Sequence, residues 1–192
     1  MRRVIKTILQ ISCILLFTSA NCFAFAIIGN ATSVTMGSSS NRPPGFSGGE
    51  FTLTTDLGGS YAAFCVEWEE HIRFNSAYGI DSVEDYASMG GGIDNGATYV
   101  NGEYRDQLSI QTKWLMNEYV NGGLKKQYSS FDSSFLGAAM QVAIWNLEDE
   151  YYYTDYQQTY GDLADMLIDQ ATISANGLDD GLFNHVKVVN LA

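Results

Sequence analysis

The sequence predicts an α+β domain, with strands near both ends of the chain and helices between them. Segments with alternating or β-branched and aromatic residues occur around residues 50–68 and again over residues 183–191. Apolar residues at helical spacing dominate the middle of the chain. The chain has 192 residues, of which 46% are hydrophobic, so it is long enough to bury one core.

Residues 1–26 are predicted to be a secretory signal peptide. Arg2, Arg3 and Lys6 give a basic start, an apolar run follows over residues 8–17, and Ala24-Phe25-Ala26 offers a cleavage site. Cleavage within residues 21–24 is the alternative. An uncleaved membrane anchor is disfavoured because the apolar run is short for a span, and a lipoprotein at Cys22 would need a small residue before it. We therefore expect a secreted protein, either extracellular, periplasmic or at the cell surface.

Export changes both the cysteine count and the charge. Cys13 and Cys22 leave with the signal peptide, so Cys65 is the only cysteine expected in the mature chain. Seven basic residues then remain against 22 acidic ones, for a charge near −15. Such a charge argues against nucleic acid or an anionic membrane as a partner and favours basic ones, lysine-rich proteins included. No second apolar span follows, so we expect no membrane span after cleavage.

Residues 27–49 are predicted to form an irregular N-terminal arm, followed by the main domain over residues 50–192. The arm is rich in glycine, serine and asparagine, carries both prolines, and has one strand candidate at residues 31–36. Two strands are expected at residues 50–55 and 60–68. The turn-like residues 56–59 join them into a hairpin and place Cys65 in the second strand.

Four helices and a closing strand are expected further on. Residues 82–85 resemble a capped helix start, stopped by the glycines at 90–92, and a second helix spans residues 106–121. Ser133 or Ser134 caps the third helix, which carries Gln141. Residues 162–174 form an amphipathic fourth helix, and residues 183–191 form the last strand.

A lone cysteine in an oxidising compartment is either buried and inert, paired between chains, or used for chemistry. The candidate for chemistry is Gln141. Gly137 lies four residues before it and Trp145 four residues after it, on the same helical stripe. A second backbone can approach a glutamine framed in this way. Attack by the Cys65 thiol on the Gln141 amide carbon would release ammonia and leave an internal thioester.

Two short motifs resemble those of the bacterial thioester domains. These are Phe64-Cys65 and the segment Gln141-Val142-Ala143-Ile144-Trp145, with Met140 where the family has threonine. The pair is also similar to one in exported Gram-negative proteins with a Pro-Glu-Pro sorting tail, which this sequence lacks. The resemblance implies a β-sandwich or barrel-like part with inserted helices. It also implies a Cys65–Gln141 thioester, supported and shielded by Phe64, Gly137 and Trp145, that captures a surface covalently as an adhesin does.

Two other interpretations remain open. Taken singly, a strand cysteine is most often a small buried hydrophobe, and a helical glutamine is most often a surface or hydrogen-bonding residue. A non-covalent binding or matrix protein with the same fold but no bond is therefore the main alternative. A cysteine hydrolase using His71 or His185 is an outsider, because its nucleophile would be expected at a helix start.

The remaining polar clusters give weaker signals. Asp81, Glu84 and Asp85, with Asp94 and Asn95 in the next loop, lack the spacing of a calcium-binding loop. Tyrosines follow the Gln141 helix and suit either a binding lip or ordinary packing: Tyr151, Tyr152, Tyr153, Tyr156 and Tyr160. We therefore expect a binding protein rather than an enzyme, with no cofactor or metal and an unidentified protein or surface as its partner.

Overall fold

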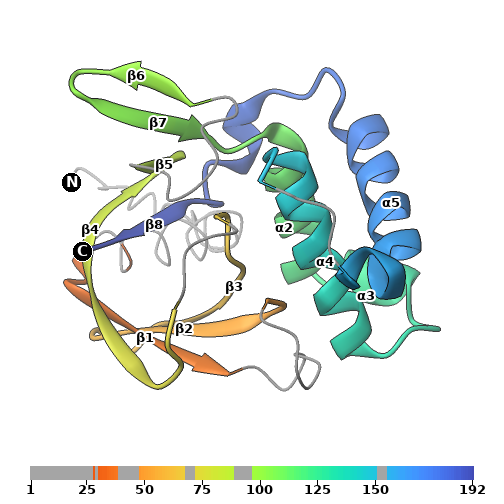
Figure 1. Cartoon of the computed structure of the whole chain (residues 1–192), viewed down its shortest axis with the longest axis horizontal. Coiled ribbons are helices and arrows are strands. Elements are labelled where there is room, and N and C mark those ends of the chain that lie inside the picture. Colours follow the sequence, from red (N-terminus) through yellow and green to blue (C-terminus); the bar gives the residue numbers. More distant parts are fainter. Residues whose placement is uncertain (1–27, 29, 39–47, 68–71, 89–96, 151–154) are drawn as a thin grey trace, which may run out of the picture.

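The computed structural model describes residues 28, 30–38, 48–67, 72–88, 97–150 and 155–192 (Figure 1). The predicted signal peptide at residues 1–26 lies outside these ranges. Within them, a curved sheet faces a layer of helices, which confirms the predicted α+β class.

The main sheet has five antiparallel strands in the order β3-β2-β1-β4-β8. The strands are β1 (Ser33–Ser38), β2 (Phe51–Thr55), β3 (Ser60–Ala63), β4 (Ser76–Glu84) and β8 (Val188–Leu191). They curve into roughly half a barrel (Figure 1). The sheet thus combines strands from both ends of the chain, and β3 and β8 form its two edges.

A second, smaller sheet extends beyond the first (Figure 1). Its strands are β5 (Tyr86–Ser88), β6 (Thr98–Val100) and β7 (Glu103–Gln107), in the order β5-β7-β6. Asn101 and Gly102 connect β6 to β7, and both have positive φ angles, of 54° and 97°. Positive φ at both central residues is the geometry that an Asn-Gly hairpin turn favours.

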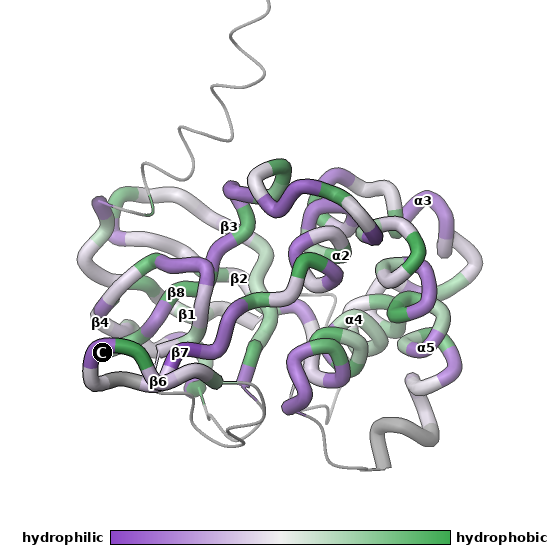
Figure 2. Tube along the Cα trace, turned by 90° about the horizontal axis from the view of Figure 1, so that it is seen from above, coloured by the Kyte–Doolittle hydropathy of each residue, from purple (hydrophilic) through white to green (hydrophobic). Residues whose placement is uncertain are grey.

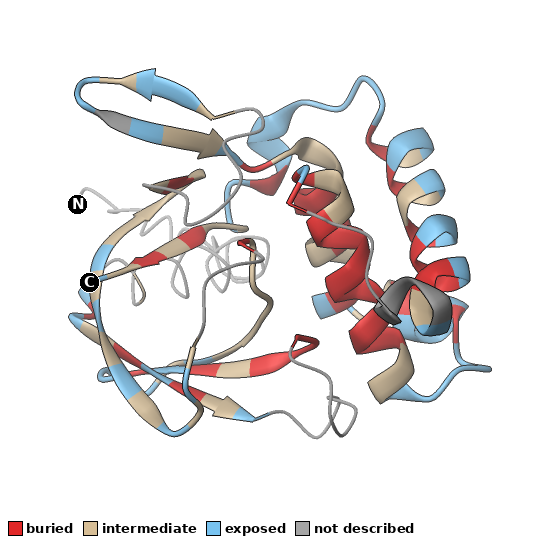
Figure 3. Ribbon diagram, in the orientation of Figure 1, coloured by how far each residue is buried: buried red, intermediate tan, exposed pale blue. Residues whose placement is uncertain are grey.

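The helices are α2 (Ile110–Val120), α3 (Gly123–Gln127), α4 (Ser133–Leu147) and α5 (Asp155–Ala175), with a short 3-10 helix, η1 (Asp180–Phe183). They gather on one side of the molecule, opposite the sheet (Figure 2). Helix α5 buries one face against α2 and α4 and exposes the other, whereas α4 is buried along most of its length (Figure 3). None of the described helices combines the length and the apolar character that crossing a membrane requires.

The predicted β2–β3 hairpin is confirmed, with Leu53 opposite Tyr61. The strand expected within the N-terminal arm is β1, and it pairs with β2 on one side and with β4 on the other. This part of the arm therefore lies in the middle of the sheet. The buried side chains of Val34 and Met36 join Phe51 and Leu53 in the apolar core on one face of the sheet.

The prediction of a helix that starts at residues 82–85 is wrong. Residues 82–84 end strand β4, where they pair with β8, and β5 begins at Tyr86. The Asp85 carboxylate does not cap a helix: it accepts a hydrogen bond from Lys187 at 2.7 Å and lies 3.5 Å from the Lys113 ammonium. Long-range pairing therefore overrides a local capping signal here.

Three other predicted boundaries shift. Residues 103–107 form strand β7, so α2 starts at Ile110 rather than at residue 106, and the Ser109 side chain caps it. Helix α5 starts earlier than predicted, at Asp155. The last strand is confined to β8, because residues 180–183 form η1.

Candidate functional site

Helix α4 carries Gln141 into the interior of the helical layer. Asp132 caps the helix by accepting a hydrogen bond from the Ser134 backbone N–H at 2.8 Å, one residue before the predicted caps. Every residue from 136 to 145 is buried, and the Gln141 side chain is 0% exposed. A helix that is apolar on all sides is packed on all sides. A buried glutamine in such a helix needs partners for both polar atoms of its amide.

Those partners are the backbone atoms of Cys65. The Cys65 N–H donates a hydrogen bond to Gln141 Oε1 at 3.0 Å, and Gln141 Nε2 donates one to the Cys65 carbonyl oxygen at 2.7 Å. The two residues are 76 positions apart in the sequence. The structure thus brings the two predicted site residues into direct contact, although it joins them through the Cys65 backbone rather than through the thiol.

The prediction that Cys65 lies inside a strand is wrong. Strand β3 ends at Ala63, where it pairs with Phe51, and Cys65 follows two residues later. The reason is the pairing with Gln141, whose side-chain amide takes the place that a neighbouring strand would occupy. The segment that follows the edge strand β3 is therefore fastened to helix α4 at Cys65.

The pairing has chemical consequences for the Gln141 amide. A donor on Oε1 draws electron density from the amide carbon and would stabilise negative charge on that oxygen during attack. Both hydrogen bonds run along the lone-pair and N–H directions, which lie in the plane of the amide. The two faces of the amide carbon are therefore not used by these bonds, and a nucleophile attacks a carbonyl carbon through a face.

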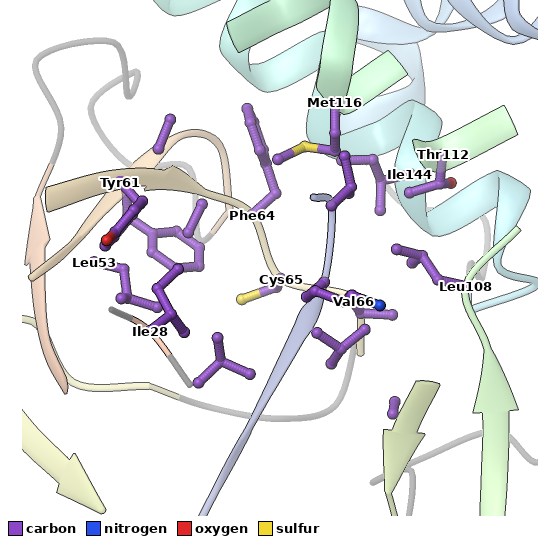
Figure 4. Close-up of a pocket in the computed structure, with 18 of the residues that line it drawn as sticks. Ile28, Leu53, Tyr61, Phe64, Cys65, Val66, Leu108, Thr112, Met116 and Ile144 are labelled. Atoms are coloured by element: carbon purple, nitrogen blue, oxygen red, sulfur yellow. The ribbon is translucent and has the colours of Figure 1, made fainter. Parts of the chain in front are cut away.

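Phe64 points away from the cavity side on which the Cys65 sulfur lies (Figure 4). Its ring meets Tyr119 of α2 edge-on, with centroids 5.3 Å apart. The buried Tyr119 hydroxyl donates to Glu50, and the Lys125 ammonium lies 4.3 Å from the Tyr119 ring centroid. Burial, reinforced by Glu50, raises the pKa of Tyr119 above its ordinary value. Phe64 therefore fastens the segment before Cys65 to the helical layer.

The other two predicted supporting residues lie on α4. Gly137 is buried, and Trp145 is only 3% exposed. Trp145 belongs to the apolar cluster of the helical layer, against which Phe64 and Cys65 also pack. The structure thus places Phe64 and Cys65 against the helical layer in which Gln141, Gly137 and Trp145 are buried.

A cavity of about 630 Å³ opens beside Cys65, between the sheet and α2. The Cys65 sulfur points toward the side of this cavity where Ile28 and Leu53 lie (Figure 4). Its sheet side is lined by apolar residues that include Met36, Leu53 and Leu191. Among the described residues, the wall includes Cys65 but not Gln141.

Three carboxylates gather near the site, and the sequence reasoning missed them. Oxygens of Glu67, Asp106 and Glu150 lie within 4.8 Å of one another, and Glu67 and Glu150 are buried. Oxygen ligands of this kind suit hard divalent cations, and close carboxylates also share protons. Burial, followed by the charges of Glu148 and Asp149, raises the pKa of Asp106 to about 6. Only the tertiary fold brings these carboxylates together, so spacing along the chain gave no signal for them.

Glu148, at the end of α4, caps the start of α2. Its carboxylate accepts hydrogen bonds from the Ser109 hydroxyl at 2.6 Å and from the Ser109 backbone N–H at 3.1 Å. Burial raises the pKa of Glu148, although the bonds from Ser109 oppose the shift. This contact fixes the C-terminal end of the Gln141 helix relative to α2.

The weaker candidates from the sequence fall into two groups. His71, Asp94, Asn95 and Tyr151–Tyr153 lie outside the described residues. His185 also lines the cavity, but its Nε2 lies 2.9 Å from the Asn117 side-chain oxygen, and burial lowers the pKa of His185. The Tyr160 ring packs edge-on against Phe135, which is consistent with ordinary packing.

The chain was compared with known proteins. No model of a known protein family, no curated protein sequence and no solved structure matches it.

Proposed function

We propose that this protein is an exported binding protein in which Cys65 and Gln141 form an internal thioester that captures amines covalently. The observation that carries the proposal is the pair of hydrogen bonds between the Cys65 backbone and the Gln141 amide. They bring a buried amide carbon next to the one cysteine expected in the mature chain. We interpret the protein as an adhesin-like molecule that acts once on a partner and does not turn over substrate.

Bond formation needs only groups that are already present. The Cys65 thiol belongs to the same residue whose N–H and C=O hold the Gln141 amide. Rotation about the Cys65 Cα–Cβ bond would therefore carry the sulfur toward a face of the Gln141 amide. The S–C bond forms, the C–N bond breaks, and ammonia leaves with the thiol proton. The Cys65 N–H on Oε1 stabilises the oxyanion formed on the way.

Capture reverses the roles of sulfur and nitrogen. A neutral primary amine attacks the Gln141 acyl carbon, an N–C bond forms, the S–C bond breaks, and the Cys65 thiol is released with a proton from the amine. The product is a substituted amide, which is more stable than the thioester. The chain therefore captures one partner once. The chain has 22 acidic and 10 basic residues, and this negative charge favours the approach of lysine-rich partners.

One observation favours the second candidate, a non-covalent binding protein with the same fold. Both polar atoms of the Gln141 amide already have partners, so the glutamine also satisfies the requirements of a purely structural link between α4 and the segment after β3. In that case Cys65 is a half-buried side chain, and the cavity beside it is the binding site.

Incubation with methylamine tests the proposal. The mature wild-type protein and the variants Cys65→Ala and Gln141→Ala are treated, digested and mapped by mass spectrometry. We expect a methylamide at Gln141 and one new free thiol in the wild type alone. Wild-type protein with an unmodified Gln141 and a thiol that is free before treatment would leave only the non-covalent candidate.

A further inference from the structure

The cavity is bordered by Cys65 but not by Gln141. Gln141 is 0% exposed and sits in a helix whose neighbouring residues are all buried. Cys65, by contrast, is half-buried and forms part of the cavity wall. A molecule that approaches the bond between these residues therefore enters from the cavity, past the sulfur.

The sheet side of this cavity is apolar. Residues alternate between the two faces of a strand, so Tyr61 and Ala63 lie on the same face of β3. Cys65, beyond the end of the strand, packs with them against the core cluster of the sheet. Leu53 and Met36 supply buried apolar side chains to the same wall. The volume of about 630 Å³ lies within the range of small-molecule sites, which runs from roughly 300 to 1,000 Å³.

Acidic groups complement this wall. Glu67 and Asp81 also line the cavity, and Lys187 is the lysine among the described lining residues. The two carboxylates are part of the excess negative charge of the chain, which attracts cations toward the opening. Farther in, apolar side chains favour the neutral form of an amine over the ammonium form. The neutral form is the one that attacks.

From this arrangement we infer that the cavity selects unbranched aliphatic primary amines, whose apolar stem lies along the sheet side while the amine reaches the acyl carbon. A lysine side chain, with its four-carbon stem, belongs to this class. The inference rests on the proposed function, because selection is expressed through attack on the thioester. Beyond amine capture, it identifies the apolar stem of the amine as the feature that the protein recognises.

A pair of simple amines tests the inference. Rates of adduct formation at Gln141 are measured with methylamine and n-butylamine, each divided by the rate of the same amine with a small-molecule thioester. This division removes differences in intrinsic nucleophilicity. Each buried methylene contributes about fourfold at most. We expect n-butylamine to react roughly tenfold faster than methylamine or more.

A variant that fills the cavity provides the second arm. Ala63→Phe places a ring on the face that carries Cys65 and should reduce the advantage of n-butylamine to roughly threefold or less. The control is Thr54→Phe in the neighbouring strand, where the side chain is exposed and outside the cavity wall, and it should keep the full advantage. If Ala63→Phe fails to fold, Ala63→Leu replaces it.

The outcomes separate the inference from the proposed function. Equal normalised rates for the two amines in the wild type would overturn selection by the stem and leave amine capture intact. An advantage that survives in folded Ala63→Phe would also overturn it. The absence of any adduct with either amine would overturn the proposed function, and the inference with it.

Discussion

Two hydrogen bonds join Gln141 to Cys65, but the two residues lie in different surroundings. Gln141 lies on α4 among ten consecutive buried residues, whereas Cys65 is half-buried on an irregular segment beyond the end of β3. The amide carbon of Gln141 is thus held by a packed helix, and Cys65 borders a cavity. The comparison shows how a fold can keep a glutamine amide rigid and away from water while its partner residue borders a cavity.

Substitution of Gln141, on the packed helix, should change the free energy of unfolding most. Gln141→Ala leaves the Cys65 N–H and C=O without their partners, at about 1–3 kcal/mol each, and adds a cavity in the packed layer. Without a thioester, we expect the free energy of unfolding to fall by about 3–5 kcal/mol in urea titrations; with one, the lost cross-link lowers it further. Gln111→Ala on α2, a partly exposed glutamine, is the matched control and should cost under about 0.5 kcal/mol.

The stability of a variant at Cys65, on the irregular segment after β3, separates the two candidate functions. Both hydrogen bonds use the backbone of residue 65, so Cys65→Ala keeps them. Without a thioester, the loss of a half-buried thiol should cost about 1 kcal/mol. With a thioester, the variant also loses a cross-link across 76 residues, and the loop-entropy relation for disulfides gives about 4 kcal/mol. Equilibrium unfolding of the wild type and of Cys65→Ala measures the difference, and a drop of only about 1 kcal/mol would count against the cross-link.

Phe64 should show how much the contact with α2 contributes to fixing the loop. Phe64→Leu loses the edge-on contact with Tyr119 and should lower stability by about 1–2 kcal/mol. The control is Phe131→Leu, because Phe131 also packs on another ring, that of Phe135, but is 40% exposed and lies just before the cap of α4. An equal effect at both positions would show that Phe64 has no special role in positioning Cys65.

The smallest effect is expected at the carboxylates near the site, and it depends on pH. Burial raises the pKa of Asp106 from 3.8 to about 6, so ionisation of its carboxyl group destabilises the folded state. This cost is absent below the lower value and is complete above the higher one. Asp106→Asn removes it.

Asp106→Asn should therefore gain more stability over the wild type at about pH 7.5 than at about pH 4, by at most about 1 kcal/mol after solvent screening. Melting temperatures of the two proteins at both pH values measure the effect. Asp169→Asn, on the exposed face of α5, is the control for the loss of a surface carboxylate. A gain for Asp106→Asn that is equal at both pH values would refute the proposed origin.

The parts of the fold that local signals encode were predictable. The β2–β3 hairpin follows from a turn between two alternating segments, and the Gln141 helix follows from its apolar spacing and its cap. Gly137 and Trp145 also mark a helix stripe that another backbone can approach, and the Cys65 backbone contacts Gln141 between them.

Non-local features account for the rest. Residues 82–85 carry a capping pattern, but pairing with β8, more than a hundred positions later, makes residues 82–84 part of a strand. Cys65 leaves the strand because its backbone partner is a distant side chain rather than a neighbouring strand. The β6–β7 hairpin was missed although Asn101-Gly102 is a strong local signal for such a turn. The carboxylate cluster needed the tertiary fold.

The intact mass of the mature wild-type protein tests the central claim most directly. It should be measured under denaturing conditions together with thiol titration and with the same measurements on Cys65→Ala and Gln141→Ala. A thioester predicts a wild-type mass lower by one ammonia than its sequence requires, with no titratable thiol, and full mass for both variants. A wild-type protein at full mass with one free thiol would contradict the account.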